Sequence, residues 1–310
     1  MRYDGRSVEK GVALNHRSCF RLHPSAPPPC SRLVLSHFQV SQLLTARRNG
    51  ESQALVSPDL GLSQLPVRLD PAGVVFPDER MLAWSMVEQI AGNEKNCFVV
   101  DEHGCHKLLA YSESTSRAYG LFPTRRAPAL LLSGVTMHRI KGIDPVEDTE
   151  RKVGTIAQVR GKVLDTCTGL GYTAIAAAQC ADRVTTIELD PVVLDLAKLN
   201  PWSQELFNNP KIDQLVGDSA QLIEGMADLS VDSILHDPPM IMLAGEMFST
   251  ALYEQFLRVL RVGGRLFHYV GDPETHGGSR TTRSVTERLH RVGFRQVQPC
   301  PEAFGVVARR

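Results

Sequence analysis

The segment Asp165-Thr166-Cys167-Thr168-Gly169-Leu170-Gly171-Tyr172-Thr173 decides the fold prediction. A short apolar run precedes it and an alanine-rich run follows it, which predicts a strand, a glycine turn and a helix. Gly169 and Gly171 permit a tight turn and a close approach of the backbone to a ligand. The start of the following helix offers free N–H groups to an anionic group. The segment therefore predicts a ligand site at the end of a buried parallel strand.

The chain after residue 150 repeats this organisation. Buried strands alternate with helices, which predicts an α/β fold with a doubly wound, Rossmann-like sheet of seven strands. We expect strands at residues 162–167, 183–188, 211–216, 231–236, 265–270, 295–298 and 304–308. We expect helices at residues 172–180, 191–199, 219–225, 247–260 and 280–291, with Gly263 and Gly264 ending the fourth.

Two acidic residues near the glycine turn bear on the kind of ligand. The spacing Gly169-x-Gly171-x-x-Ala174 also fits a dinucleotide fingerprint, and Glu188, at the end of the second strand, can hold ribose hydroxyls in either case. Asp165 favours S-adenosylmethionine (SAM), because a carboxylate there repels a pyrophosphate and attracts the ammonium group of SAM. The alternatives are that Asp165 caps the turn and that Glu188 is a solvated loop acid.

Polar side chains also end the third and fourth strands. Asp218, in Gly217-Asp218-Ser219, either accepts a hydrogen bond from an adenine amino group or caps the next helix. The fourth strand ends in His236-Asp237-Pro238-Pro239. Its two prolines make a stiff loop whose first side chains and carbonyls point toward a substrate, and an amine nucleophile needs acceptors placed in this way. A strand-terminating Pro-Pro turn is the alternative.

In this order, these residues resemble class I SAM-dependent methyltransferases over about residues 151–310. Segments 165–173, 198–203 and 236–239 are more closely similar to an uncharacterised, mainly archaeal group of predicted methyltransferases, in which Met137-His138-Arg139 also recurs. The resemblance implies methyl transfer from SAM to an unidentified acceptor, with an amine as one candidate. The cofactor-binding residues it implies are Asp165, Thr166, Gly169, Leu170, Gly171, Glu188, Asp218 and Ser219. The catalytic residues it implies are Asp237 and His236, with substrate contacts from Pro238, Pro239, His138 and Arg139.

Within this resemblance, Asp165 meets the ammonium group of SAM, and the Gly169–Gly171 turn with the helix start meets its carboxylate. Two positions depart from the methyltransferase pattern. Cys167 stands where the loop usually has glycine, and Met240 stands where amino-methylating enzymes carry an aromatic residue that stacks on a base or amide. Methylation of nucleobases or glutamine is thereby disfavoured. We interpret Cys167 as a buried thiol rather than a nucleophile, because no partner base is identifiable.

The segment 244–253, followed by Leu260 and Gly263-Gly264, resembles the corresponding part of spermidine synthases. Those enzymes use the same sheet and transfer an aminopropyl group from decarboxylated SAM. The resemblance therefore leaves aminopropyl transfer open as an alternative to methyl transfer. A non-catalytic binding module with the SAM-binding fold is a second alternative.

The first half of the chain has a different composition and sequence pattern. Residues 1–50 contain eight Arg or Lys against Asp4 and Glu9, and we expect residues 1–32 to form a poorly ordered basic tail. Residues 33–149 predict a small, strand-rich α+β module, with a helix at 78–91 and strands at 97–101, 106–112 and 117–122. The SAM-binding domain then covers residues 150–310. Cys97, His103, Cys105 and His106 match no zinc spacing, so we expect no metal site.

The composition sets further limits. The chain has 310 residues with 34 basic and 34 acidic side chains, so its charge gives no reason to expect a nucleic-acid or membrane-surface partner. Its apolar runs fall short of the ~20 residues of a membrane helix. Seven scattered cysteines and the lack of a recognisable secretory signal predict a cytoplasmic protein. The oligomeric state stays open, with a homodimer as one option.

Overall fold

The computed structural model describes residues 32–156 and 161–310. The basic tail that we predicted at residues 1–32 lies outside this description, apart from Arg32. Within the described residues no helix is long and apolar enough to cross a membrane.

The second half of the chain is built on one seven-stranded sheet. Its strands are β12 (Lys162–Asp165), β13 (Arg183–Glu188), β14 (Ile212–Val216), β15 (Val231–His236), β16 (Leu260–Tyr269), β17 (Arg295–Cys300) and β18 (Gly305–Arg309). They lie in the order β14-β13-β12-β15-β16-β18-β17. The first five pair in parallel, and β18 runs antiparallel to both of its neighbours. The predicted α/β fold with a seven-stranded sheet is confirmed.

The strand register brings the carboxyl ends of the parallel strands to one edge. Asp165, the last residue of β12, lies between Thr186 of β13 and Leu235 of β15. The chain proceeds from β12 to β13 and β14 on one side and then crosses to β15 on the other. The end of β12 is therefore the topological switch point, where sheets of this kind bind ligands.

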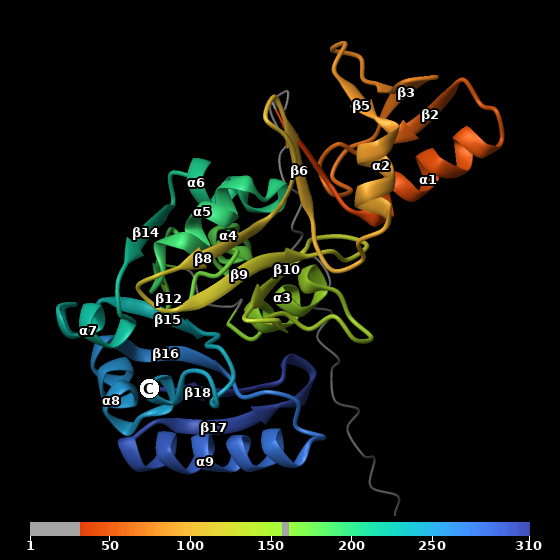
Figure 1. The fold of residues 1–310 in the computed structure, drawn as a ribbon. Helices are drawn as coiled ribbons and strands as arrows, with labels where there is room; N and C mark the ends of the chain where they lie inside the picture. The colour runs from red at the N-terminus through yellow and green to blue at the C-terminus, as the bar shows by residue number, and fades with distance from the viewer. Residues whose placement is uncertain (1–31, 157–160) are drawn as a thin grey trace, which may run out of the picture.

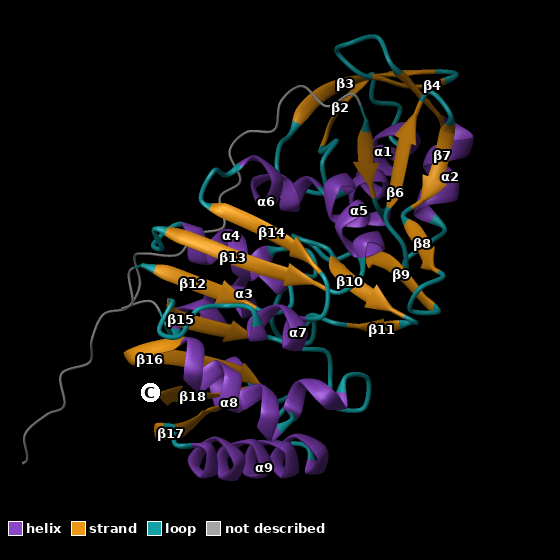
Figure 2. Ribbon diagram, turned by 90° about the vertical axis from the view of Figure 1, so that its left-hand side faces the viewer, coloured by secondary structure: helices purple, strands orange, loops and turns teal. Residues whose placement is uncertain are grey.

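Helices cover both faces of this sheet (Figure 2). They are α3 (Pro145–Gly154), α4 (Tyr172–Ala178), α5 (Pro191–Leu199), α6 (Gln204–Asn208), α7 (Ser219–Glu224), α8 (Thr250–Val259) and α9 (His276–Val292), with short 3-10 turns η1 (Pro201–Ser203), η2 (Gly245–Phe248) and η3 (Pro301–Ala303). Val163 packs in a core with α4 and α5, whereas Leu164 packs in a second core with α8 and α9. Successive strand residues thus serve two different cores, as expected for a strand buried on both faces.

The first part of the chain forms a smaller unit, which is red and orange in Figure 1. Its elements are β1 (Leu33–Leu35), α1 (His37–Arg48), β2 (Gln53–Val56), β3 (Leu65–Asp70), β4 (Gly73–Val75), β5 (Met81–Ala83), α2 (Trp84–Ala91), β6 (Phe98–Asp101) and β7 (Gly104–Lys107). The strands form two sheets, in the orders β1-β6-β7 and β2-β3-β4-β5. Leu35, Leu43, Val87 and Phe98 belong to one core inside this unit.

A third sheet joins this unit to the seven-stranded sheet. It contains β8 (Leu109–Ser112), β9 (Arg117–Phe122), β10 (Ala129–Leu132) and β11 (Val135–Thr136), all antiparallel. Leu121 and Leu130 share a core with Tyr172 of α4 and Val193 of α5. This sheet therefore packs on the helices beside the switch point.

Several predicted elements differ from the structure. Residues 78–91 do not form one helix, because Glu79 has a left-handed backbone (φ 64°) in a tight turn before β5, and α2 begins only at Trp84. The predicted strand 106–112 breaks at Leu108 into β7 and β8, which belong to different sheets. The boundary after residue 149 falls inside α3, which Asp144 caps and Pro145 begins.

The fourth predicted helix of the second half also differs. The structure has η2 and then α8, which ends at Val259. Gly263 and Gly264 do not end a helix; they lie within β16. Because β16 starts at Leu260, directly after α8, no loop that these glycines could form follows the helix.

Candidate active site

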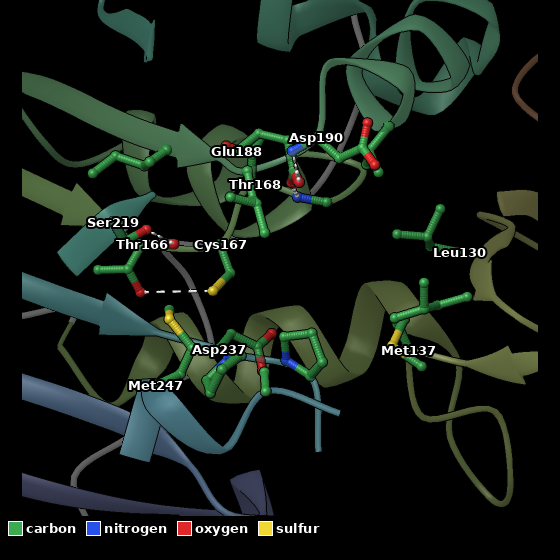
Figure 3. A pocket seen from close by; sticks show the side chains of 18 of the residues that line it. Leu130, Met137, Thr166, Cys167, Thr168, Glu188, Asp190, Ser219, Asp237 and Met247 are labelled. Atoms are coloured by element: carbon green, nitrogen blue, oxygen red, sulfur yellow. Dashed lines mark hydrogen bonds between the residues drawn. The ribbon is translucent and has the colours of Figure 1, made fainter. Parts of the chain in front are cut away.

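A cavity opens at the switch-point edge of the sheet (Figure 3). The seven-stranded sheet contributes the turn after β12 and the ends of β13, β14 and β15, and the third sheet contributes β9 and β10. The cavity measures about 1110 Å³ with its open mouth included. In Figure 3, Glu188 and Asp237 lie on opposite sides of it, and Leu130 and Met137 lie at one end. The carboxylates of the lining all come from the second half of the chain, whereas Leu130, Leu132 and Met137 come from the first half.

The structure brings most of the predicted site residues to this cavity. The lining includes Thr166, Gly169, Glu188, Asp218, Ser219, Asp237, Pro238, Pro239 and His138. The predicted residues that do not line it are Asp165, Leu170, Gly171, His236 and Arg139. Each of these five has a structural reason for its position.

Asp165 lies buried beneath the turn and does not reach the cavity. Thr173 and Thr186 donate hydrogen bonds to its Oδ2 atom, at 3.1 and 2.9 Å. Its Oδ1 atom is buried and has no hydrogen-bond partner in the described residues. Burial raises the pKa of this carboxyl to about 7. The predicted contact of Asp165 with an ammonium group is therefore not seen, because both oxygens lie inside the protein.

Leu170 and Gly171 shape the turn from below. Leu170 is fully buried in the core with α4. Gly171 caps α4 in a left-handed conformation (φ 78°) and lies against Leu206 of α6. Its N–H donates to the carbonyl of Thr168 at 2.7 Å. The backbone donor predicted here for a carboxylate is thus already used within the turn.

Glu188 is held in place by the backbone around it. Gly169 N–H donates to its Oε2 atom at 2.8 Å and Asp190 N–H donates to its Oε1 atom at 3.1 Å. Burial raises the pKa of Glu188 above its ordinary value. Because each carboxylate oxygen accepts more than one hydrogen bond, Glu188 can still receive ribose hydroxyls from the cavity side.

Two neighbouring residues combine capping with a place in the lining. Asp218 accepts a hydrogen bond from Ala220 N–H at 2.7 Å and so caps α7. Ser219 donates its hydroxyl to the carbonyl of Thr166 at 2.6 Å, which ties α7 to the turn after β12. Both roles that the sequence left open for Asp218, cap and ligand contact, are compatible with this geometry.

His236 lies behind the cavity wall. Its Nε2 atom donates to the carbonyl of Met247 at 2.8 Å, so its Nδ1 atom accepts from the hydroxyl of Thr166 at 2.6 Å. Burial lowers the pKa of His236 to about 4. The predicted catalytic role therefore does not fit, since a fully buried neutral imidazole with both nitrogens bonded has no path to a substrate.

The pair His138-Arg139 divides between two places. His138 lines the cavity, its Nδ1 atom accepts from Leu130 N–H at 3.2 Å, and burial lowers its pKa to about 4. Arg139 points away from the cavity, where its guanidinium lies 3.5 Å from the ring centroid of Phe304. It donates to Asp148 Oδ1 at 3.1 Å. The predicted substrate contact of Arg139 is therefore not seen.

Asp237 lines the cavity and is paired with a lysine that the sequence analysis missed. Lys152 Nζ donates to both oxygens of Asp237, at 2.7 and 3.0 Å. Lys152 lies in α3, which the sequence analysis divided at a domain boundary. The signal that was available is the i,i+4 spacing of Asp148 and Lys152 behind an Asp-Pro helix start.

Cys167 lines the cavity beside Thr166. Burial raises the pKa of its thiol well above the ordinary value, and the nearby carboxylates of Glu188 and Asp165 raise it further. The thiol is therefore neutral, which agrees with a packing role. The described residues contain no group of three or more potential metal ligands.

Comparison with known proteins places the chain in a family, although no family model matches it. It is 41% identical over 235 residues to Uncharacterized protein MJ1233 of Methanocaldococcus jannaschii, which covers 75% of this chain and 80% of that protein. The chain belongs to the MJ1233 family. This confirms the resemblance to an archaeal group that the segments at residues 165–173 and 236–239 indicated.

The chain has a lower sequence identity to a member of another family. It is 27% identical over 165 residues to putrescine N-methyltransferase 2 of Nicotiana tabacum, which covers 51% of this chain and 46% of the plant protein. The chain thus spans less than half the length of that relative. The chain is therefore similar to this enzyme over about half of its own length.

Two crystal structures of spermidine synthase share the fold. One, in complex with the transition state analogue AdoDATO, has a TM-score of 0.55 and covers 65% of this chain and 72% of its own. The other, from Thermotoga maritima, has a TM-score of 0.52 and covers 64% and 70%. Both are 16% identical to the MJ1233 family chain. At this identity the likeness concerns the fold, including the strand-rich part before the sheet.

Proposed function

We propose that the cavity binds SAM and that the protein transfers its methyl group to an amine acceptor. The observation that carries this proposal is the charge of the lining. Five carboxylates line the cavity, from Glu188, Asp190, Asp218, Asp237 and Glu246, against one guanidinium, from Arg117. Of the five, Asp237 is also paired with the Lys152 ammonium behind the lining, so the lining remains acidic without it. An acidic cavity attracts a sulfonium cofactor and a cationic amine and repels a pyrophosphate. The name of the putrescine N-methyltransferase relatives supports the same chemistry.

The residues at the strand ends fit such a cofactor. Glu188 would receive the ribose hydroxyls, and Asp218 with Ser219 would lie at the adenine end. Asp165 takes no direct part and instead fixes the turn through Thr173 and Thr186. Cys167 narrows the cavity at the position where related loops have glycine.

The chemistry is an in-line displacement. The cationic acceptor would first give one proton to water, which frees the lone pair of its nitrogen. SAM would supply an electrophilic methyl group, so that this lone pair forms the new N–C bond while the C–S electron pair passes to sulfur, which becomes neutral. Asp237 accepts a hydrogen bond from the acceptor N–H and thereby aims the lone pair. Pro238 and Pro239 stiffen the loop that carries this carboxylate. The methylated nitrogen then gives its proton to water.

Aminopropyl transfer from decarboxylated SAM is the second candidate, and one observation favours it. The N–H groups of Gly169 and Gly171, which the sequence assigned to the cofactor carboxylate, donate instead to Glu188 and to Thr168. Decarboxylated SAM has no carboxylate and needs no such donor. The spermidine synthase fold of the chain is consistent with this reaction.

Two measurements separate these candidates. Calorimetry compares the binding of SAM and decarboxylated SAM to the purified protein. Incubation with methyl-labelled SAM and a fractionated cell extract then reports which fraction receives the label. We expect tighter binding of SAM and label in a small, basic molecule. Tighter binding of decarboxylated SAM would favour aminopropyl transfer, whereas SAM binding without any transfer of label would indicate a non-catalytic binding module.

A further inference from the structure

A buried chain of charges connects the first half of the molecule to Asp237. Arg139 donates to Asp148 Oδ1 at 3.1 Å, and Lys152 Nζ lies 2.9 Å from Asp148 Oδ2. Lys152 in turn donates to both oxygens of Asp237. The four side chains carry two positive and two negative charges, so the cluster is neutral. Alternating opposite charges stabilise the ionised form of each side chain where the protein shields it from water.

The exposed fractions of Asp148, Lys152 and Asp237 show which of them faces the cavity. Asp148 and Lys152 are 1% and 3% exposed, and Asp237 is 19% exposed. Asp237 is the member that lines the cavity, whereas Lys152 is not part of the lining. Lys152 therefore has no direct access to a substrate, and its ammonium acts on one through Asp237.

Lys152 is fixed from three sides. α3 carries it beside Asp148, one helical turn earlier, and its Nζ atom lies 4.6 Å from the ring centroid of Tyr269. Burial alone would lower the pKa of Lys152, but the carboxylates of Asp148 and Asp237 raise it overall. The lysine is therefore a permanent cation with a single geometry, unlike a solvated surface lysine.

We propose that Lys152 is a positioning residue that keeps the Asp237 carboxylate ionised and oriented toward the acceptor amine, with Arg139 and Asp148 holding Lys152 in turn. The proposal rests on the proposed function. It gives Asp237 the role of a fixed hydrogen-bond acceptor rather than a base, because the Lys152 ammonium stabilises its ionised form. It also gives Arg139 a role that needs no contact with the cavity.

The pH dependence of Asp237 involves every charged group around it. Lys152 and Asp148 from α3, Arg139 from the segment before α3, and Tyr269 from β16 face the pair. Asp165 and Cys167 lie on the other side, and the Asp237 charge contributes to the raised pKa of each. His138 is buried near Lys152 and stays neutral. Burial raises the pKa of Asp237, and Lys152 opposes that rise.

Carbon-13 NMR of the aspartate carboxyl groups tests the proposal in the full-length protein. Asp237→Asn identifies the Asp237 signal by its loss. In Lys152→Met we expect the titration midpoint of Asp237 to rise by about 1–3 pH units, and Lys152→Arg should restore most of the wild-type value. Lys198→Met is the matched control, because Lys198 pairs with Asp195 at the surface. An unchanged midpoint in folded Lys152→Met would overturn the proposal.

Two further measurements test the role of Lys152, one with a second variant and one with the transfer reaction. If Lys152→Met does not fold, the double variant Asp148→Asn/Lys152→Met removes one charge of each sign and still deprives Asp237 of its cation. We then expect a smaller rise of the midpoint, because the Asp148 charge that also raises the pKa of Asp237 is gone. Calorimetry on Lys152→Met should show unchanged SAM affinity, while label transfer to the accepting fraction falls tenfold or more. Equal transfer at equal SAM affinity would contradict the positioning role. Loss of SAM binding in the wild type would instead refute the proposed function.

Discussion

At the scale of single residues, Asp165 links the turn to the pH dependence of stability. Burial raises its pKa from 3.8 to about 7, so the folded protein binds this proton more tightly than the unfolded chain does. Its contribution to stability is therefore present at low pH and is lost as the pH rises from 3.8 toward 7. One pKa unit corresponds to about 1.4 kcal/mol.

Asp165→Asn tests this effect, because asparagine keeps an oxygen for Thr173 and Thr186 without a charge. Between pH 5 and pH 8 we expect the free energy of unfolding of the wild type to fall relative to this variant by about 2–3 kcal/mol, measured by urea unfolding. Asp195→Asn, at an exposed position, should track the wild type. A constant difference between Asp165→Asn and the wild type at both pH values would show that Asp165 titrates normally.

The position of a site residue could be predicted from the sequence where the residue lies at the end of a strand. Glu188 ends its strand, Asp218 and Asp237 come shortly after theirs, and all three line the cavity. Asp165 and His236 occupy strand positions too, but their side chains point into the sheet rather than out of its edge. Alternation along a strand that is buried on both faces leaves no hydrophobic pattern from which to tell these directions apart.

At the scale of elements, the turn between β12 and α4 depends on Gly171. A Cβ atom there would lie 2.7 Å from Leu206 Cδ2, and the backbone has a φ of 78°. We expect Gly171→Ala to lower the free energy of unfolding by about 1–3 kcal/mol in urea unfolding. Gly169→Ala is the control, because its nearest neighbour, Leu130 Cδ2, lies 3.9 Å away.

The two glycine variants separate strain from crowding. Both positions have positive φ, so backbone strain alone predicts equal losses, whereas contact with Leu206 predicts a larger loss for Gly171→Ala. The double variant Gly171→Ala/Leu206→Ala should lose less than the sum of the single variants. Equal losses for the two single variants would contradict the packing role of Gly171.

Elements were predictable where local signals agree. The helix Pro191–Leu199 has an Asp-Pro start, and the strand Val231–His236 is mostly buried and ends at a Pro-Pro loop; both match the prediction residue by residue. α1 was missed, although Ser36 and Gln39 form a capping box at its start. α3 was missed because it is strongly charged and its buried side combines Val146 and Val153 with the ionic groups Asp148 and Lys152, which interrupt the apolar stripe.

At the scale of the whole molecule, one core crosses from the small first unit to the seven-stranded sheet. Val34 and Leu60 share a core with Trp202, whose Nε1 atom donates to the Leu60 carbonyl at 3.1 Å. Trp84 lies in the separate core of the first unit. The two tryptophans of the chain therefore report on the two cores independently.

This arrangement predicts one cooperative unfolding transition. Trp84→Phe and Trp202→Phe each leave a single tryptophan, and the urea midpoints of fluorescence from the two variants should coincide with their midpoints by circular dichroism. Two separate midpoints, with Trp84 changing at lower urea, would show that the first unit unfolds alone.

The overall arrangement was only partly predictable. The parallel sheet follows from the alternation of buried strands and helices. The three antiparallel sheets of the first half depend on pairings such as Leu33 with Val100, for which no local pattern exists. The zero net charge of the chain likewise gave no indication of an acidic cavity, because it is the sum of a basic segment of fifty residues and an acidic remainder.

The central claim is that the cavity binds SAM, and calorimetric titration with SAM tests it most directly. Wild type and Glu287→Ala, a change on the exposed side of α9, should bind with the same affinity. Glu188→Ala should bind tenfold or more weakly, about 1.4 kcal/mol, because the ribose loses its carboxylate partner. No binding by the wild type, or equal affinity in Glu188→Ala, would contradict the account.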